Sequence, residues 1–193
     1  MENSFFALIS RMRYIGRWGL MRNSEPENVQ EHSHMVAVLA HALALIRREV
    51  LGVPCDPERC AALALYHDAS EILTGDLPTP IKYHSREISS AYHEVERLAA
   101  ERLLAMLPEV LRPAYAPLLT GGTAGEHALV KAADKLSAYI KCVEERKAGN
   151  NEFRSAERQT RAALEDMALP EVAYFLETCM PAFEKTLDEL GAM

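Results

Sequence analysis

Apolar side chains recur at helical spacing along most of the chain, most clearly in its first quarter. Successive positions in this stretch are three or four residues apart, and they are Val29, His32, Val36, Leu39, Leu43 and Ile46. Such spacing places side chains on one face of an α-helix. Asn28 precedes the stretch and is a suitable N-cap. The pattern therefore predicts a long helix that begins after Asn28.

Two further features predict where the next helix begins and where helix is interrupted. Asp56 is followed by Pro57, and proline is well accommodated at the first helical position. We predict that this helix runs through His67. Residues 75–80 contain two prolines two residues apart, so this segment is predicted to be non-helical.

The remainder of the chain also has helical rather than alternating periodicity. Prolines and glycines between residues 108 and 122 interrupt the pattern, and Gly149 is a stop signal for the helix before it. Helices are predicted from Ser85 to about Leu107, over residues 126–148, and over residues 152–167 and 171–190. We therefore predict an all-α fold, a single domain over residues 1–193 with about six or seven helices.

The overall composition excludes several classes of protein. Of 193 residues, 49% are hydrophobic, and 21 basic residues stand against 28 acidic ones, for a net charge of −7. These values exclude a disordered chain, and they disfavour a protein that binds nucleic acid by neutralising phosphates. The longest apolar stretch, residues 35–46, is too short to span a bilayer. We expect neither a nucleic-acid polymer nor a membrane as partner.

The cysteines and the first residues indicate a cytoplasmic protein. The four cysteines form no C-x-x-C pair and are expected to be reduced thiols: Cys55, Cys60, Cys142 and Cys179. The short apolar run at residues 5–9 precedes the arginines rather than following them, which is the wrong order for a signal peptide.

Basic residues are concentrated at the beginning of the chain. The first 22 residues carry a local charge of +3, from Arg11, Arg13, Arg17 and Arg22 against Glu2. This is either a solvated basic helix end or an anion-binding corner. Arg17 is a planar, bidentate donor suited to a phosphate. The only tryptophan, Trp18, follows it in a turn between Gly16 and Gly19.

Four residues from three predicted helices carry the candidate chemistry. His32 lies on the apolar face, His67 and Asp68 follow an uncharged stretch, and Asp134 lies at the edge of a later apolar face. Each alone has an ordinary explanation, as a core histidine, a capping aspartate or a helix-edge carboxylate. Together they form a mixed nitrogen and oxygen set that suits Co²⁺, Mn²⁺, Ni²⁺ or Zn²⁺ better than Ca²⁺ or an iron–sulfur cluster. Glu71 is four residues after His67, on the same face if the helix continues.

These residues and their surroundings resemble a known family. The order His32, His67-Asp68, Asp134 is similar to the signature of the HD-domain phosphohydrolases. The resemblance extends to the bacterial YfbR-type 5′-deoxynucleotidases through local segments, which are Arg17-Trp18, ENVQEHS at 27–33, YHDASE at 66–71, TGDLPTP at 74–80 and AGNNE at 148–152. It covers the chain from residue 5 to about residue 190.

The resemblance implies a function and a set of site residues. It implies an HD-type helical bundle, a homodimer, and hydrolysis of 2′-deoxyribonucleoside 5′-monophosphates. It implies one divalent metal ion per subunit, with Co²⁺ or Mn²⁺ favoured and Ni²⁺, Zn²⁺ or Cu²⁺ possible. The matching metal ligands are His32, His67, Asp68 and Asp134, the catalytic carboxylate is Glu71, and the substrate-binding residues are Arg17, Trp18, Asp68, Asp76, Leu77, Pro78 and Thr79.

Two alternatives remain open from the sequence. One is another HD-domain nucleotide phosphohydrolase, such as a deoxynucleoside triphosphohydrolase or an alarmone hydrolase. A longer phosphate chain would require additional basic residues, and few are present near the motifs. The other is a non-catalytic nucleotide-sensing protein, against which the complete ligand set and Glu71 argue.

Overall fold

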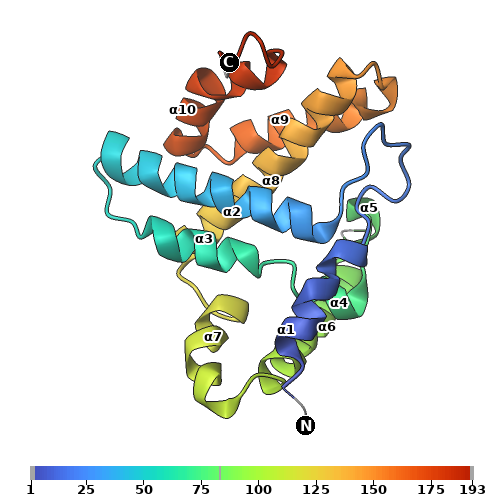
Figure 1. Cartoon of the computed structure of the whole chain (residues 1–193), viewed down its shortest axis with the longest axis vertical. Helices are drawn as coiled ribbons and strands as arrows, with labels where there is room; N and C mark the ends of the chain where they lie inside the picture. The colour runs from blue at the N-terminus through green and yellow to red at the C-terminus, as the bar shows by residue number, and fades with distance from the viewer. Residues whose placement is uncertain (1–2, 83, 192–193) are drawn as a thin grey trace.

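The structure, a computed structural model, describes residues 3–82 and 84–191, and it consists of helices joined by turns (Figure 1). Seven helices of the described residues have eight or more residues: α2 (Val29–Leu45), α3 (Pro57–Leu65), α6 (Arg86–Ala105), α7 (Arg112–Leu119), α8 (Ala124–Lys147), α9 (Arg154–Asp166) and α10 (Pro170–Thr178). Shorter ones are α1 (Phe5–Ile9), α4 (Glu71–Thr74) and α5 (Thr79–Lys82). Within these ranges there is no β-strand, only an isolated bridge between Gly16 and Asn28. The predicted all-α fold is confirmed.

The core lies where α2, α3 and α8 pack together. Figure 1 shows α2 lying across α8 with α3 beside it, while α9 and α10 are on one side and α1, α6 and α7 on the other. Leu43 of α2 and Leu136 of α8 are completely buried in this cluster. Burying one such side chain contributes about 1.5–3 kcal/mol. The apolar faces of α2 and α8 therefore fix the relative position of the two helices that carry His32 and Asp134.

Caps define where the two long helices begin. The side chain of Asn28 accepts hydrogen bonds from the backbone N–H groups of Gln30 and Glu31, and the Glu31 carboxylate accepts from the N–H of Asn28. The predicted N-cap of α2 is thus confirmed. Thr123 and Glu126 form an equivalent capping box at the beginning of α8. Such caps typically contribute about 1 kcal/mol each.

The second predicted helix ends earlier than expected. α3 stops at Leu65, and residues 66–70 form turns, so the prediction that the helix runs through His67 is wrong. The N–H of Tyr66 donates to the carbonyl of Leu63, and that of His67 to the carbonyl of Ala64, which tightens the last turn and ends the helix. Glu71 begins a separate short helix, α4, so the argument that it shares a helical face with His67 is also wrong.

Prolines interrupt the chain less than the sequence predicts. Residues 75–80 are not entirely non-helical, because α5 begins at Thr79. α7 contains Pro113 in its first turn, where a missing N–H costs nothing, and Pro117 in its interior. By contrast, the last helix is shorter than the sequence predicts. The helix predicted over 171–190 ends at Thr178, shortly before Pro181.

The structure also bears on membrane-spanning helices and on the state of the cysteines. No helix of the described residues combines the length and the apolar character required to cross a membrane. The four cysteines are all free thiols.

Candidate metal centre

Three of the predicted ligands converge at the middle of the bundle. His32 projects from α2, while His67 and Asp68 come from the turn after α3. Their ligand atoms all lie within 4.8 Å of one another. Asp134 of α8 lies beside this trio, with its Oδ1 3.0 Å from Nε2 of His32. The structure therefore brings together the two imidazoles and two carboxylates that the sequence singles out. We call these four residues the metal cluster.

The two imidazoles are oriented in the way that metal ligands require. His32 Nδ1 lies 3.2 Å from Oγ of Ser137, and His67 Nδ1 lies 2.7 Å from the carbonyl oxygen of Ala64. Both Nε2 atoms are buried and make no hydrogen bond within the described residues, and each lies close to a carboxylate oxygen, at 3.0 Å for His32 and Asp134 and 3.1 Å for His67 and Asp68. Anchoring one ring nitrogen leaves the other to bind a metal. The donor set fits a divalent ion of borderline softness.

Charge is concentrated in the metal cluster. Burial acts to lower the pKa of His67, but the charge of Asp68 outweighs it and raises that pKa to about 9. Burial acts to raise the pKa of Asp68, but His67, His32 and Arg17 hold it well below its usual range. The interaction with His32 likewise lowers the pKa of Asp134 despite burial. Both carboxylates are therefore ionised and available to a cation.

Glu71 is buried next to this cluster and forms an ion pair with Lys82. Its side chain is 2% exposed, and its Oε1 lies 3.0 Å from Nζ of Lys82 on α5. Its Oε2 has no hydrogen-bond partner in the part of the chain that is described. Burial and the charge of Asp68 raise the pKa of Glu71 to about 7, although Lys82 opposes the shift. This carboxyl group can therefore exchange a proton near neutral pH.

Arg17 and Trp18 lie at the beginning of a loop over residues 17–27, and the base of this loop is next to the metal cluster. The N–H of Arg17 donates to the carbonyl of Glu27 at 2.9 Å, which closes the segment just before α2. Nη1 of Arg17 lies 3.5 Å from Oδ2 of Asp68. The ring of Trp18 packs on Phe153, with 5.3 Å between centroids. Of the arginines in the basic first segment, Arg17 has the contact with the metal cluster.

The loop after α4 supplies the remaining predicted substrate contacts. Burial raises the pKa of Asp76, while the charges of Arg17 and Lys82 act in the opposite direction. Leu77 and Pro78 are half-buried. Thr79 begins α5, but its side chain is outside the described part of the structure. Asp76 is therefore close enough to Arg17 and Lys82 for their charges to oppose the rise in its pKa.

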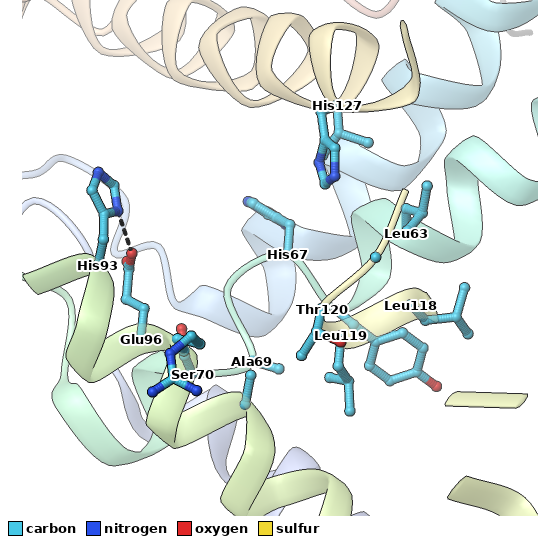
Figure 2. A pocket seen from close by; sticks show the side chains of 15 residues that line it. Leu63, His67, Ala69, Ser70, His93, Glu96, Leu118, Leu119, Thr120 and His127 are labelled. Carbon is cyan, nitrogen blue, oxygen red and sulfur yellow. Dashed lines mark hydrogen bonds and ion pairs between the residues drawn. The ribbon is translucent and has the colours of Figure 1, made fainter. Parts of the chain in front are cut away.

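A cavity of about 490 Å³ adjoins His67. Figure 2 shows His67 between His93 and Glu96 of α6 on one side and His127 of α8 on the other, with Thr120 at the end of α7 nearby. Cavities of this size are typical of small-molecule sites. The metal cluster is therefore adjacent to open space at the junction of α6, α7 and α8.

Sequence reasoning did not identify three residues that support the site. Ser137 orients His32, Lys82 pairs with Glu71, and Glu27 contacts Arg17 and Trp18. Ser137 occurs three residues after Asp134, so its place near the cluster could have been inferred from helical spacing. Glu27 and Lys82 pair with residues on the other side of a turn, and such pairings are not predicted by helical periodicity in the sequence.

The family model and the most similar proteins described below indicate the same family. The family model described as 5′-deoxynucleotidase YfbR-like matches residues 4–183. A 5′-deoxynucleotidase of Vibrio cholerae is 51% identical over 192 residues, covering 98% of this chain and 99% of that protein. The 5′-deoxynucleotidase YfbR of Escherichia coli is 49% identical over 192 residues, covering 98% and 96%.

Solved structures show the same fold. An HD-domain phosphohydrolase from Listeria innocua superposes with a TM-score of 0.80 at 26% identity, covering 93% of this chain and 88% of that one. The cyanophage S-2L HD phosphohydrolase DatZ, solved with dA and one catalytic Zn²⁺ ion, gives a TM-score of 0.64 at 22% identity, covering 93% and 96%. The full-length similarity and the HD-type fold agree, and this chain belongs to the YfbR-like 5′-deoxynucleotidase family.

Proposed function

We propose that this protein is a metal-dependent 5′-deoxynucleotidase, which hydrolyses 2′-deoxyribonucleoside 5′-monophosphates to deoxynucleosides and phosphate. The observation that carries the proposal is the pair of buried imidazole Nε2 atoms that face two ionised carboxylates and lack hydrogen-bond partners within the described chain. Unpartnered buried polar atoms are costly, and binding a cation removes that cost. Membership of the family supplies the substrate class.

The proposed metal ligands are His32, His67, Asp68 and Asp134, holding one divalent ion per subunit. When bound, the ion supplies Lewis acidity toward the phosphoryl group and the attacking water. Co²⁺ and Mn²⁺ are the favoured ions, and Ni²⁺, Zn²⁺ and Cu²⁺ also suit the donor set. The Zn²⁺ ion in the cyanophage relative is consistent with an ion of this class.

The surrounding residues have separate proposed roles in binding the nucleotide. Arg17 offsets the charge of the phosphoryl oxygens, because its Nη1 faces the metal cluster and a guanidinium matches phosphate geometry. Trp18 and the loop formed by Asp76, Leu77, Pro78 and Thr79 hold the sugar. Asp68 contributes to both the metal and the substrate side.

Glu71 is the proposed catalytic carboxylate. It is buried close to Asp68 without being one of the proposed ligands, and one of its oxygens has no hydrogen-bond partner in the described structure. A pKa of about 7 lets the group accept a proton from the attacking water and return it to the leaving 5′ oxygen. Lys82 holds the other carboxylate oxygen in place.

We also propose a homodimer in the cytoplasm. α6 exposes Ile88, Val95 and Leu98, which are 42%, 48% and 50% exposed and lie at helical spacing on one face. Such a face suits contact with a second copy of this chain. Light scattering after size exclusion would measure the mass, and a monomer at micromolar concentration would contradict this part of the proposal.

A phosphate-release assay with a nucleotide panel tests the activity. We expect release from dAMP that is lost with a chelator and restored by Co²⁺ or Mn²⁺. AMP, 3′-dAMP and dATP should react more slowly, because the site is proposed to hold one phosphoryl group and a sugar without a 2′-hydroxyl. Full activity of metal-free protein, confirmed by elemental analysis, would overturn the metal dependence. Equal rates on AMP and dAMP, or faster release from dATP, would favour another HD-domain hydrolase.

A further inference from the structure

We infer that Glu27 is a positioning residue that holds Arg17 and Trp18 in one arrangement, so that phosphate binding and sugar selection depend on the same carboxylate. The inference rests on the proposed function above, since it assumes that Arg17 and Trp18 contact the nucleotide. It adds a residue whose side chain has no metal, proton-transfer or substrate-contacting role in that proposal.

Two side-chain hydrogen bonds converge on one carboxylate oxygen of Glu27. Its Oε2 atom accepts a hydrogen bond from Nε of Arg17 at 3.1 Å and another from Nε1 of Trp18 at 2.8 Å. The Arg17 and Glu27 side chains are only 13% and 16% exposed, so water competes weakly for these bonds. Hydrogen bonds to an ionised carboxylate are stronger than neutral ones. One oxygen atom therefore fixes two neighbouring side chains that would otherwise move independently.

For Arg17, the bond to Glu27 determines which edge of the guanidinium is available. Because Nε is engaged by Glu27, the planar group is rotated so that Nη1 approaches Oδ2 of Asp68 at 3.5 Å. Nη1 thus faces the metal cluster, where the phosphoryl group is proposed to lie. A guanidinium without this anchor would retain its charge but lose its orientation.

For Trp18, the bond helps to hold an unfavourable backbone conformation. Trp18 has a φ of 58°, in the left-handed region that bulky residues rarely adopt. Such a conformation persists only when its surroundings determine it. Here the indole is fixed at its nitrogen by Glu27 and at its face by Phe153, with 5.3 Å between ring centroids. Removing the Glu27 carboxylate leaves the ring held from one side.

Glu27 is itself held in a fixed position. Its carbonyl accepts from the N–H of Arg17 at 2.9 Å, and the next residue, Asn28, bridges to Gly16 and caps α2. The carboxylate therefore projects from a rigid junction between the segment and α2. This distinguishes it from Glu25, whose side chain is exposed and takes no part in these two hydrogen bonds.

Kinetics of matched variants test the inference. Glu27→Ala should lower kcat/KM for dAMP by roughly 10–100-fold, the loss expected when two charge-assisted hydrogen bonds are removed. It should also reduce the preference for dAMP over AMP, because Trp18 is no longer fixed. Glu27→Gln keeps the shape and one acceptor oxygen, so it should fall between wild type and Glu27→Ala. Glu25→Ala is the control and should match wild type.

Fluorescence provides a readout that does not depend on activity. Trp18 is the only tryptophan, so emission reports on this side chain alone. Glu27→Ala should shift the emission to longer wavelength and lower its anisotropy in the folded protein, while Glu25→Ala should leave both unchanged. Unchanged emission and an unchanged preference for dAMP over AMP in folded Glu27→Ala and Glu27→Gln would overturn the inference. If wild type has no deoxynucleotidase activity, the proposed function fails, and emission alone decides whether Glu27 positions Trp18.

Discussion

α8 carries two buried polar clusters that differ in how well their groups are partnered. Toward its N-terminal half is the metal cluster, which Asp134 joins and Ser137 supports. Nearer its C-terminal end are Lys141 and Glu145, which contact the backbone of residues 24 and 25, while Asn150, just beyond the helix, donates to Glu145 and to the carbonyl of Arg22. We call this second group the Glu145 clamp.

In the Glu145 clamp every acceptor has a donor. The carboxylate, 1% exposed, accepts from the N–H of Ser24 at 2.8 Å, the N–H of Glu25 at 3.3 Å and Nδ2 of Asn150 at 2.8 Å. It also pairs with Lys141, whose Nζ donates in addition to the carbonyl of Glu25. These contacts hold the segment that carries Arg17 and Trp18 against the end of α8.

In the metal cluster, by contrast, several buried atoms make no hydrogen bond within the described residues. Its two imidazole Nε2 atoms, and Oε2 of neighbouring Glu71, are buried without hydrogen-bond partners among the residues described. His32 of the metal cluster is as fully buried as Glu145 of the clamp, so burial alone does not distinguish a structural cluster from a binding site. The number of buried polar atoms without a hydrogen-bond partner does distinguish the two. A structural cluster is stable when its own groups satisfy one another, whereas a ligand site leaves donors or acceptors free for the ligand.

The strongest test of this contrast removes a proposed metal ligand. Asp68→Ala should abolish both stoichiometric metal binding and phosphate release, because one of four ligands and a contact of Arg17 are lost. Elemental analysis and the phosphate assay measure the two effects. Glu58→Ala, which removes an exposed carboxylate of α3, is the control and should keep both. Retained metal together with full turnover in Asp68→Ala would contradict the ligand assignment.

The second test separates proton transfer from metal binding. Glu71→Ala should retain metal and lose about 10²–10⁴-fold in kcat, the range typical of a missing general acid or base. Metal content and steady-state kinetics are the measurements. A variant that turned over dAMP at close to the wild-type rate would show that Glu71 has no part in the reaction.

The third test concerns the clamp, where stability rather than activity should change most. Glu145→Ala leaves Lys141 buried without its carboxylate, and breaking such a pair costs about 3–5 kcal/mol. Urea unfolding of the metal-free protein would measure the loss. Glu144→Ala alters the neighbouring exposed carboxylate and should change stability by less than about 0.5 kcal/mol. Equal stability of the two variants would mean that the clamp is not structural.

The clamp also predicts an acid dependence. Burial opposes ionisation of Glu145, but Lys141 and the backbone N–H of Ser24 outweigh it and lower its pKa from 4.5 to about 2. A carboxyl group with a lowered pKa contributes its full stabilisation above its unfolded-state pKa, and this is lost as pH falls through the folded value. Wild type should therefore lose this contribution between pH 4.5 and 2, whereas Glu145→Gln should show a flatter profile in that window.

The smallest expected effect lies in the support of His32. Ser137→Ala removes the hydrogen-bond partner of Nδ1, and loss of such a partner typically costs about 10–100-fold in metal affinity or activity. Ser33→Ala is the control, since Ser33 is also buried on α2 but its hydroxyl has no partner in the described structure. Metal titration would distinguish them, and equal affinities would show that Ser137 does not orient the ring.

The sequence predicts the regular part of the site better than the irregular part. His32 is recognisable because a histidine interrupts an apolar helical face, and Asn28 because capping is local. His67 is predicted as a ligand from its motif and lies beside His32 and Asp68, yet its backbone is misassigned, because the end of α3 depends on how the following turn packs. The link between Glu27 and Trp18 joins residues on opposite sides of a turn, and no periodicity encodes it.

The spacing of the two clusters on α8 has a consequence for how the family can diversify. Positions 134 and 145 are 11 residues apart, which corresponds to about 16 Å along a helix at ~1.5 Å per residue. The segment of residues 16–28 is tied to the far cluster through residues 22, 24 and 25, while Arg17 at its base contacts the near one. Under the proposed function, substitutions in that segment or at its anchor are expected to change which monophosphate is accepted without replacing any proposed metal ligand.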